Sequence, residues 1–215
     1  MPYIVSALVG YLVGTLNPAY LLGKLKGMDI RKQGSRNAGA SNALILFGKV
    51  TGILCAAFDI AKAALSVFLM TLLFPHADTF AVTIAFCILG HIFPFYMGFR
   101  GGKGLACLGG AFIALDLRVF AVVLAVELVV VLATRYICFV PITASVVLPV
   151  VYGLMYRDLI GACILAAVAV VIFLKHLVNL RRILEGSEMR ITYLWNREKE
   201  TARLKKFYGD EEGKG

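Results

Sequence analysis

Long apolar stretches separated by short polar turns dominate the chain as far as about residue 175. The apolar stretches cover approximately residues 3–22, 50–74, 79–97, 105–133, 137–155 and 159–175. A helix needs about 20 apolar residues to cross a hydrocarbon core about 30 Å thick, so stretches of this length predict membrane-spanning helices. We therefore expect an all-α, polytopic integral membrane protein.

The stretch over 105–133 is too long for a single span. As one helix it would be about 43 Å long at 1.5 Å per residue. Asp116 and Arg118 would then lie near its middle, where charges are costly in lipid. We predict two shorter helices with a turn at "LDLR", which brings the total to about seven membrane-embedded helices.

The basic residues indicate how these helices are oriented. If the N-terminus lies outside, the outer turns contain only Arg118 and Arg157, each beside an aspartate, and the cytoplasmic turns contain the other loop cations. This distribution satisfies the positive-inside rule. It predicts a cytoplasmic C-terminus, and it gathers the polar segments 31–49, 91–104 and 176–188 at the cytoplasmic face.

The composition agrees with a single membrane domain. Of the 215 residues, 60% are hydrophobic and 16% are charged, against about 25% charged in soluble domains, and the mean hydropathy is +0.84. The net charge of +9 is expected to mark cytoplasmic loops and not a nucleic-acid surface. The five cysteines are scattered without a C-x-x-C pair, so we expect buried thiols and no disulfide or metal site. The first apolar stretch lacks a basic leader and is interpreted as a retained span.

The first polar segment reads "RKQGSRNAGASNA" over 31–43. Glycines allow backbone N–H groups to turn toward an anion, and hydroxyl and amide side chains add donors without bulk. An anion site and a flexible polar loop are both compatible with this composition. The candidate ligands are Gly34, Ser35, Arg36, Asn37, Ser41 and Asn42.

The second polar segment contains "GHIFPFYMGFRGGKGLA". A nucleotide-binding P-loop is excluded, because Met97 stands where its first glycine belongs and Gly104 where a Ser or Thr should bind magnesium. What remains is the cation Lys103 on a turn with Gly101, Gly102 and Gly104, at the start of a helix whose N-terminus favours anions. A basic loop that only sets topology is the alternative, but topology does not require the glycines.

The third polar segment, "KHLVNLRRILEGSE", ends the last apolar stretch. His176, Asn179 and Arg182 share one helix face, which favours an anion or carbonyl site over a purely structural histidine. Asp59 and Lys62, three residues apart, are expected mainly to form an ion pair near the membrane surface. The three segments thus offer many donors and almost no acids, as a site for a doubly anionic substrate requires.

The three segments resemble the motifs of the bacterial membrane glycerol-3-phosphate acyltransferases that use acyl phosphate as donor. The family patterns are close to G-S-G-N-x-G-A-T-N-V-x-R, G-H-x-x-P-x-x-x-x-F-K-G-G-K-G-V-A-T and H-x-x-N-x-x-R-L-x-x-G-x-E. This chain has "GSRNAGASNALI", "GHIFPFYMGFRGGKGLAC" and "HLVNLRRILEGSE". Their order and spacing hold over about residues 3–188.

The resemblance implies an enzyme of the bacterial inner membrane that acylates the 1-hydroxyl of glycerol 3-phosphate with a long-chain acyl phosphate. The product would be 1-acylglycerol 3-phosphate, an intermediate of phospholipid synthesis, and no metal, nucleotide or other cofactor is implied. The resemblance places Ser35 and Asn37 in a phosphate site, makes Lys103 the key cation, and makes His176 and Asn179 acceptor-site residues. Lys103, His176 and Ser35 are therefore the candidate catalytic residues, with His176 either a base or a binding residue. The candidate substrate-binding residues are Gly34, Arg36, Asn37, Ser41, Asn42, Gly101, Gly102, Gly104, Asn179 and Arg182.

The first motif departs from the family pattern. Arg36 replaces a glycine, Ser41 a threonine and Ile45 an arginine, and Cys107 replaces the last threonine of the second motif. The missing arginine removes one expected phosphate contact, which Arg36 or Arg31 is a candidate to replace. A divergent paralogue with a changed substrate or no catalysis is one alternative function. A transporter of a phosphorylated solute is another, although no internal repeat is visible.

Residues 189–215 extend past the resemblance. We expect residues 1–188 to form the membrane acyltransferase domain and 189–215 to be a basic extension without a catalytic role. The extension is either an interfacial helix on the anionic inner leaflet or disordered, and its end, "GDEEGKG", is expected to be disordered. The sequence leaves the oligomeric state open, a monomer included.

Overall fold

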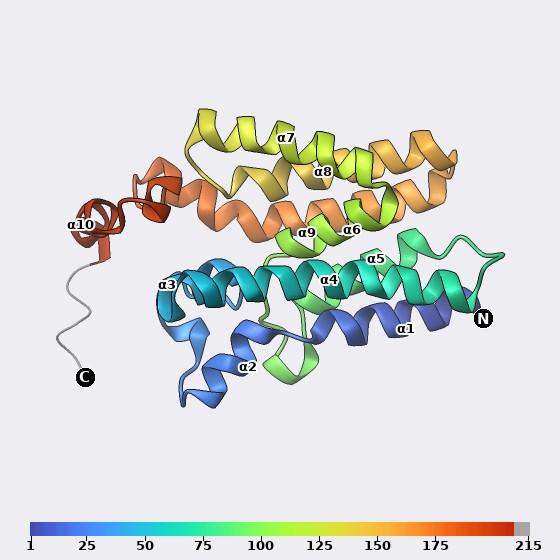
Figure 1. The fold of residues 1–215 in the computed structure, drawn as a ribbon, viewed down its shortest axis with the longest axis horizontal. Coiled ribbons are helices and arrows are strands. Elements are labelled where there is room, and N and C mark those ends of the chain that lie inside the picture. The colour runs from blue at the N-terminus through green and yellow to red at the C-terminus, as the bar shows by residue number, and fades with distance from the viewer. Residues whose placement is uncertain (209–215) are drawn as a thin grey trace.

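A computed structural model describes residues 1–208, apart from the side chains of residues 197, 201 and 205–208. This part of the chain is all-α, as predicted (Figure 1). Short 3₁₀ turns lie at η1 (Ile30–Lys32), η2 (Phe95–Met97) and η3 (Ile191–Leu194). The α-helices are α1 (Pro2–Thr15), α2 (Pro18–Leu25), α3 (Ala40–Phe47), α4 (Lys49–Leu73), α5 (Phe80–Ile92), α6 (Leu105–Leu115), α7 (Leu117–Thr134), α8 (Phe139–Tyr156), α9 (Leu159–Leu184) and α10 (Arg197–Tyr208).

Within the described residues, 6 helical segments are long and apolar enough to cross a membrane. They are Pro2–Leu25, Lys49–Leu73, Phe80–Met97, Leu117–Thr134, Phe139–Tyr156 and Leu159–Leu184. The apolar helix α6 adds a seventh segment, but its 11 residues reach only about 16 Å. The chain is an integral membrane protein, and its helices correspond to the predicted segments.

The predicted break in the stretch 105–133 is confirmed. Helix α6 ends at Leu115, and Asp116 caps the start of α7 by accepting hydrogen bonds from the backbone N–H groups of Arg118 (2.7 Å) and Val119 (3.2 Å). The charged turn therefore satisfies backbone donors that a helix start leaves unpaired.

The first apolar stretch forms one candidate span, Pro2–Leu25, as expected, but it consists of two helices. It breaks between α1 and α2, where Pro18 lacks a backbone donor and the Asn17 side chain accepts from the Tyr20 N–H at 2.8 Å. The Asn17 amide also donates to the Ala38 carbonyl at 2.8 Å, and Lys62 donates to the Leu16 carbonyl. Contacts with distant segments thus stabilise the break.

The last apolar stretch is longer than the sequence indicated. Helix α9 continues past residue 175 to Leu184, so most of the third polar segment is helical. His176 and Asn179 are both buried on this extension, which confirms that they share an inward-facing side of one helix.

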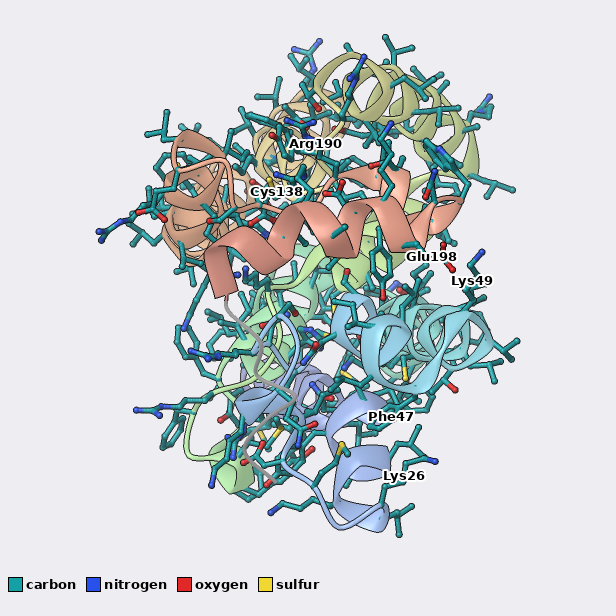
Figure 2. The ribbon with its side chains drawn as sticks, turned by 90° about the vertical axis from the view of Figure 1, so that its left-hand side faces the viewer. Lys26, Phe47, Lys49, Cys138, Arg190 and Glu198 are labelled. Carbon is teal, nitrogen blue, oxygen red and sulfur yellow. The ribbon has the colours of Figure 1, made fainter. Side chains whose placement is uncertain are left out.

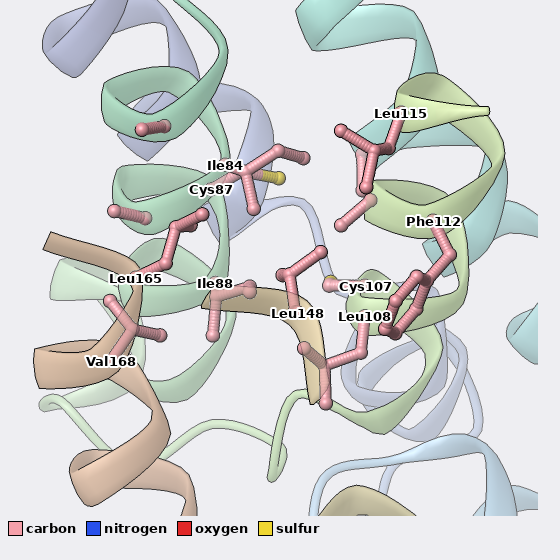
Figure 3. Packing of buried hydrophobic residues seen from close by; sticks show 14 of the residues in the cluster. Ile84, Cys87, Ile88, Cys107, Leu108, Phe112, Leu115, Leu148, Leu165 and Val168 are labelled. Carbon is pink, nitrogen blue, oxygen red and sulfur yellow. The ribbon is translucent and has the colours of Figure 1, made fainter. Parts of the chain in front are cut away.

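Five helices enclose the main apolar core. Ile84 and Ile88 of α5 face Leu108 of α6, Leu148 of α8 and Leu165 of α9 across the centre of the bundle (Figure 3). Four of the cysteines are buried as expected, Cys163 is exposed, and all five are free thiols.

Glycines allow neighbouring helices to approach closely. A Cβ atom on Gly14 of α1 would lie 2.1 Å from the Cys87 carbonyl oxygen of α5, and one on Gly110 of α6 would lie 2.2 Å from the Ile60 oxygen of α4. In lipid, where no hydrophobic force drives helices together, such close backbone packing provides the attraction.

The short helices α5 and α6 meet at the second polar segment. At 1.5 Å per residue their 13 and 11 residues reach about 20 and 16 Å, less than the membrane core. Figure 1 shows part of their connecting loop beside α2, toward the end of the bundle where α2 and α3 lie. The loop therefore places the second polar segment near the end of the bundle that carries α2 and α3.

Candidate active site

The second and third polar segments are joined by Lys103 and Asn179. The ammonium of Lys103 donates to the Asn179 Oδ1 atom, and Asn179 is itself buried on α9. Burial lowers the pKa of Lys103 to about 8, and Glu188 opposes this effect while Arg182 and Lys175 increase it. Lys103 thus remains mostly cationic at neutral pH, in a poorly hydrated position.

His176 lies one helical turn before Asn179 on the buried face of α9. Its Nδ1 atom is 2.8 Å from the Ile172 carbonyl oxygen. A carbonyl only accepts, so Nδ1 is the donor and, in the neutral imidazole, Nε2 is the acceptor. His176 is 3% exposed, and this tautomer leaves Nε2 able to accept a proton or a hydrogen bond.

Backbone hydrogen bonds within the second segment shape its glycine turn. The N–H groups of Gly101 and Gly102 donate to the carbonyls of Ile92 and His91, each at 3.0 Å. These two N–H groups are therefore engaged and do not face a phosphate, contrary to expectation. Gly104 has a φ of 92°, which favours glycine, and it caps the start of α6.

A buried polar cluster supports this turn. Lys62 Nζ lies 2.6 Å from Asp59 Oδ1 and 3.1 Å from His91 Nδ1. A Cβ atom on Gly102 would lie 2.1 Å from His91 Nε2, so the turn rests directly on the imidazole. The predicted Asp59–Lys62 ion pair is confirmed, but it lies inside the bundle because His91 and the Leu16 carbonyl also contact it.

In the first segment, Asn42 forms part of the loop framework and is not an exposed ligand. Its amide donates to the carbonyls of Ile30 (2.7 Å) and Gln33 (3.0 Å), and its oxygen accepts from the Ser35 N–H (2.8 Å). Asn42 is completely buried. Loop contacts use its hydrogen-bonding groups in this structure, and its expected role as a substrate ligand stays a prediction.

Gly34 and Ser35 take their positions from Asn42. Gly34 has a φ of 59°, and a Cβ atom there would lie 2.3 Å from the Asn42 Oδ1 atom, so only glycine fits. The Ser35 and Asn37 side chains are half-buried, and Ser41 is exposed in the first turn of α3. The half-buried pair matches the two positions that the resemblance assigned to phosphate.

Arg31 links the first segment to the second. Its guanidinium donates to the carbonyls of Met97 and Arg100 and pairs with Asp29 at 2.8 Å. The hydrogen bond from Arg31 holds the pKa of Asp29 at about 2, which keeps this partner charged. Arg31 is thus engaged as a bridge between the two segments in this structure.

Arg36 and Ile45 mark the departures from the family pattern. Arg36 is exposed and has a φ of 60°, in the left-handed region where most residues are disfavoured. This backbone conformation explains why the family pattern has glycine there. Ile45 is half-buried in α3.

Glu188 and His91 stand within the motifs, but the residue pattern alone suggested no role for either. Glu188 accepts from the Asn179 amide at 2.7 Å and lies near Arg182. Burial raises the pKa of Glu188, while Asn179, Lys103 and Arg182 oppose the rise. The positions of Glu188 and His91 within the motifs were the one sign in the sequence that they have a role. Their hydrogen-bond partners are known only from the fold.

A groove on the apolar surface lies away from these polar groups. It encloses about 940 Å³ between α8 and α9 and is lined by apolar residues such as Val146, Leu154 and Phe173. None of its lining residues belongs to the three polar segments. The polar site is therefore defined by its hydrogen-bond network and not by this groove.

Comparison with known proteins shows the family of this chain. The model of the glycerol-3-phosphate acyltransferase family matches residues 4–186, which contain all the groups described above except Glu188. The chain belongs to this family. The acyltransferase family model ends before η3 and α10, which form the C-terminal extension.

Named family members align over most of the chain. Glycerol-3-phosphate acyltransferase 1 of Oceanobacillus iheyensis is 32% identical over 92% of this chain and 99% of its own length. The glycerol-3-phosphate acyltransferase of Staphylococcus saprophyticus is 32% identical over 90% of this chain and 100% of its own. An acyltransferase of Legionella pneumophila is 36% identical over 89% of this chain and 69% of its own.

Solved structures of a family member share the fold. The crystal structure of PlsY, an integral membrane glycerol 3-phosphate acyltransferase, in its glycerol 3-phosphate form has a TM-score of 0.79 and 28% identity, covering 89% of this chain and 96% of that chain. Its lysophosphatidic acid form has a TM-score of 0.76 and 27% identity over the same shares.

Proposed function

We propose that this protein transfers an acyl group from a long-chain acyl phosphate to the 1-hydroxyl of glycerol 3-phosphate. The products are 1-acylglycerol 3-phosphate, which is lysophosphatidic acid, and inorganic phosphate. The observation that carries the proposal is the cationic Lys103, held by Asn179 next to the buried His176. A family match through the same segments supports it.

The reaction needs little chemical activation because an acyl phosphate is already a mixed anhydride. The substrate hydroxyl oxygen attacks the acyl carbonyl carbon, a new ester bond forms, and the bond between that carbon and the phosphate oxygen breaks. The hydroxyl proton passes to a phosphate oxygen or to His176. Holding the two substrates together supplies about 7–11 kcal/mol of barrier lowering in favourable cases, while the apolar interior accommodates the acyl chain.

Lys103 supplies the positive charge for this step. Its ammonium is directed by Asn179 and stands at the N-terminus of α6, where the helix dipole adds further positive potential. In a poorly hydrated site such a charge stabilises developing negative charge more strongly than it would in water. Ser35 is proposed to bind phosphate from the first segment.

The proposed membrane arrangement places this site at the cytoplasmic face of the bacterial inner membrane. The N-terminus lies outside, about seven membrane-embedded segments follow, and the C-terminus is cytoplasmic. The charge distribution along the sequence supports this orientation. Residues 1–188 form the catalytic domain in this proposal.

The test is an assay of purified protein with palmitoyl phosphate and labelled glycerol 3-phosphate, scored for labelled lysophosphatidic acid. We expect product with palmitoyl phosphate and none when palmitoyl-CoA replaces it. A folded, monodisperse sample that forms no product would contradict the proposal. Product from the CoA ester alone would contradict the assigned donor.

Lys103→Ala tests the site itself. Removing the cation should lower kcat/KM by about 100-fold or more, as expected for the loss of an electrostatic contact to the transition state. Arg100→Ala is the matched control, because it removes an exposed cation from the same loop and should retain most activity. A Lys103→Ala enzyme with near-normal turnover would refute the assignment.

A further inference from the structure

Helix α10 lies beyond the family match yet packs against the third polar segment. The matched residues end at 186, and α10 begins at Arg197. Figure 2 shows α10 crossing in front of the bundle, with Cys138 and Arg190 on one side and Lys49 on the other. The helix therefore covers the end of the molecule nearest the polar segments.

Arg203 binds the loop at the end of the third segment. Its guanidinium donates to the carbonyl oxygen of Gly186 and, at 2.6 Å, to that of Glu188. The same guanidinium pairs with Glu200 at 2.6 Å. A planar donor group thus contacts two carbonyls of the same loop, which fixes the loop more tightly than one contact would.

Glu200 binds the segment that follows this loop, at Arg190 and Thr192. The residue is only 4% exposed. Its carboxylate accepts from the Arg190 backbone N–H at 2.8 Å and from the Thr192 hydroxyl at 3.2 Å. Burial opposes the ionisation of Glu200, but the hydrogen bonds from Arg203, Arg190 and Thr192 outweigh it and lower its pKa.

The loop held by α10 carries a residue that reaches the proposed site. Glu188 contributes its backbone carbonyl to Arg203 and its carboxylate to the amide of Asn179, at 2.7 Å. The other end of the Asn179 side chain accepts from Lys103. A continuous set of contacts therefore runs from α10 to the cation of the site.

The contacts of α10 differ from those of a helix that lies on a membrane. An interfacial helix needs an apolar face to enter the lipid boundary. In α10 the side chains of Glu200 and Arg203 make polar contacts with the protein, and Leu204 beside them is also half-buried. The helix is thus fitted to the third segment.

We propose that Arg203 and Glu200 are positioning residues, which hold the loop 186–190 so that Glu188 and Asn179 direct Lys103 toward the substrate phosphate. This inference rests on the proposed function. The positioning role belongs to the C-terminal extension of this chain and lies outside the segment matched by the family model.

The kinetic test compares Arg203→Ala with Lys199→Ala. Lys199 is exposed on the same helix, so its replacement removes the same charge without loosening the loop. Arg203→Ala should lower kcat about 10-fold, since small displacements of a positioned group cost this much or more, while KM for glycerol 3-phosphate changes little. Arg203→Lys keeps the charge and a donor group but lacks the planar guanidinium, so it should recover part of the loss. Lys199→Ala should match the wild type.

A second measurement reports on Lys103 without relying on turnover. Trace acetylation of the full-length protein at different pH values, followed by peptide mass spectrometry, measures the apparent pKa of the Lys103 amine. Release of the loop would admit water around Lys103 and move Glu188 away from it, so Arg203→Ala should shift this apparent pKa away from the wild-type value. The charged or titratable groups that face Lys103 are Glu188, Arg182, Cys138, Lys175 and His176.

The outcomes separate the two proposals. If Arg203→Ala retains wild-type kcat and an unchanged Lys103 titration, the positioning role is refuted. A loss of activity that only follows a loss of folded protein, with the Lys103 titration unmoved in the folded fraction, also refutes it. Should Arg203→Ala not fold, the same measurements on Arg203→Lys and Glu200→Gln decide. A wild-type protein inactive with acyl phosphate but with a shifted Lys103 titration in Arg203→Ala would refute only the proposed function.

Discussion

Lys103 and His176 show how neighbouring polar residues acquire different capacities from their immediate contacts. The Lys103 ammonium gives a hydrogen bond to Asn179 and keeps its charge near neutral pH. The Nδ1–H group of His176 donates a hydrogen bond to the Ile172 carbonyl, which leaves Nε2 as an acceptor. One residue is thus suited to hold a phosphate and the other to accept a hydrogen bond from a hydroxyl.

Replacing His176 distinguishes a base from a binding residue. If His176 acts as the base, His176→Ala should lower kcat by about 100-fold, the lower range of general base effects, with KM little changed. If it binds glycerol 3-phosphate, KM should rise instead. The acceptor geometry at Nε2 favours an effect on kcat, and steady-state kinetics with varied glycerol 3-phosphate measure it. A variant with both parameters unchanged would remove His176 from the site.

For single residues, the sequence predicted which polar residues of the motifs gather at the site, but it did not predict several of their hydrogen-bond partners. Ser35 and Asn42 are equivalent as polar donors in the sequence. In the fold, Asn42 is buried and its side chain forms hydrogen bonds with the backbone of Ile30, Gln33 and Ser35. The side chain of Ser35, in contrast, is half-buried. Whether an amide binds substrate or backbone depends on which groups lie opposite it.

At the scale of elements, the turn between α5 and α6 depends on tight packing over a polar cluster. The Gly101 and Gly102 N–H groups bind carbonyls of α5, and the imidazole of His91 fills the space beneath Gly102. His91 is in turn held by Lys62 and Asp59. The turn therefore presents Lys103 from a rigid base although most of its residues are glycines.

Gly102→Ala should destabilise this turn. The added Cβ would lie 2.1 Å from His91 Nε2, so the imidazole or the turn must move, and we expect a cost of about 1–3 kcal/mol, as for other overpacked sites. Thermal unfolding in detergent and the acyl-transfer assay should both show a loss. Gly109→Ala is the control, because its Cβ would meet Ile60 only at 3.5 Å. Equal melting temperatures for the two variants would contradict this account of the turn.

At the scale of the whole molecule, the burial of Lys103 within the folded bundle predicts that the enzyme loses activity at alkaline pH. Its pKa is lowered from 10.5 to about 8, so the cation is present below this pH and is lost as the pH rises through it. The plot of kcat/KM against pH should therefore fall above about pH 8, because this parameter reports groups of the free enzyme. Lys103→Arg, which stays charged, should lose this alkaline limb. An unchanged limb in that variant would assign it to another group.

The sequence by itself determined the all-α membrane architecture, the break at Asp116 and the family. These features depend on long local patterns, since about 20 apolar residues predict a span wherever they occur, and motif residues are visible at fixed spacings. The tertiary structure decided the partners: the contact of Lys103 with Asn179, the cluster of Asp59, Lys62 and His91, and the packing of α10 on the third segment. Each joins residues that are distant in the chain or lie on different elements, and short-range hydrogen bonds and ion pairs form only after helix packing has brought such groups together.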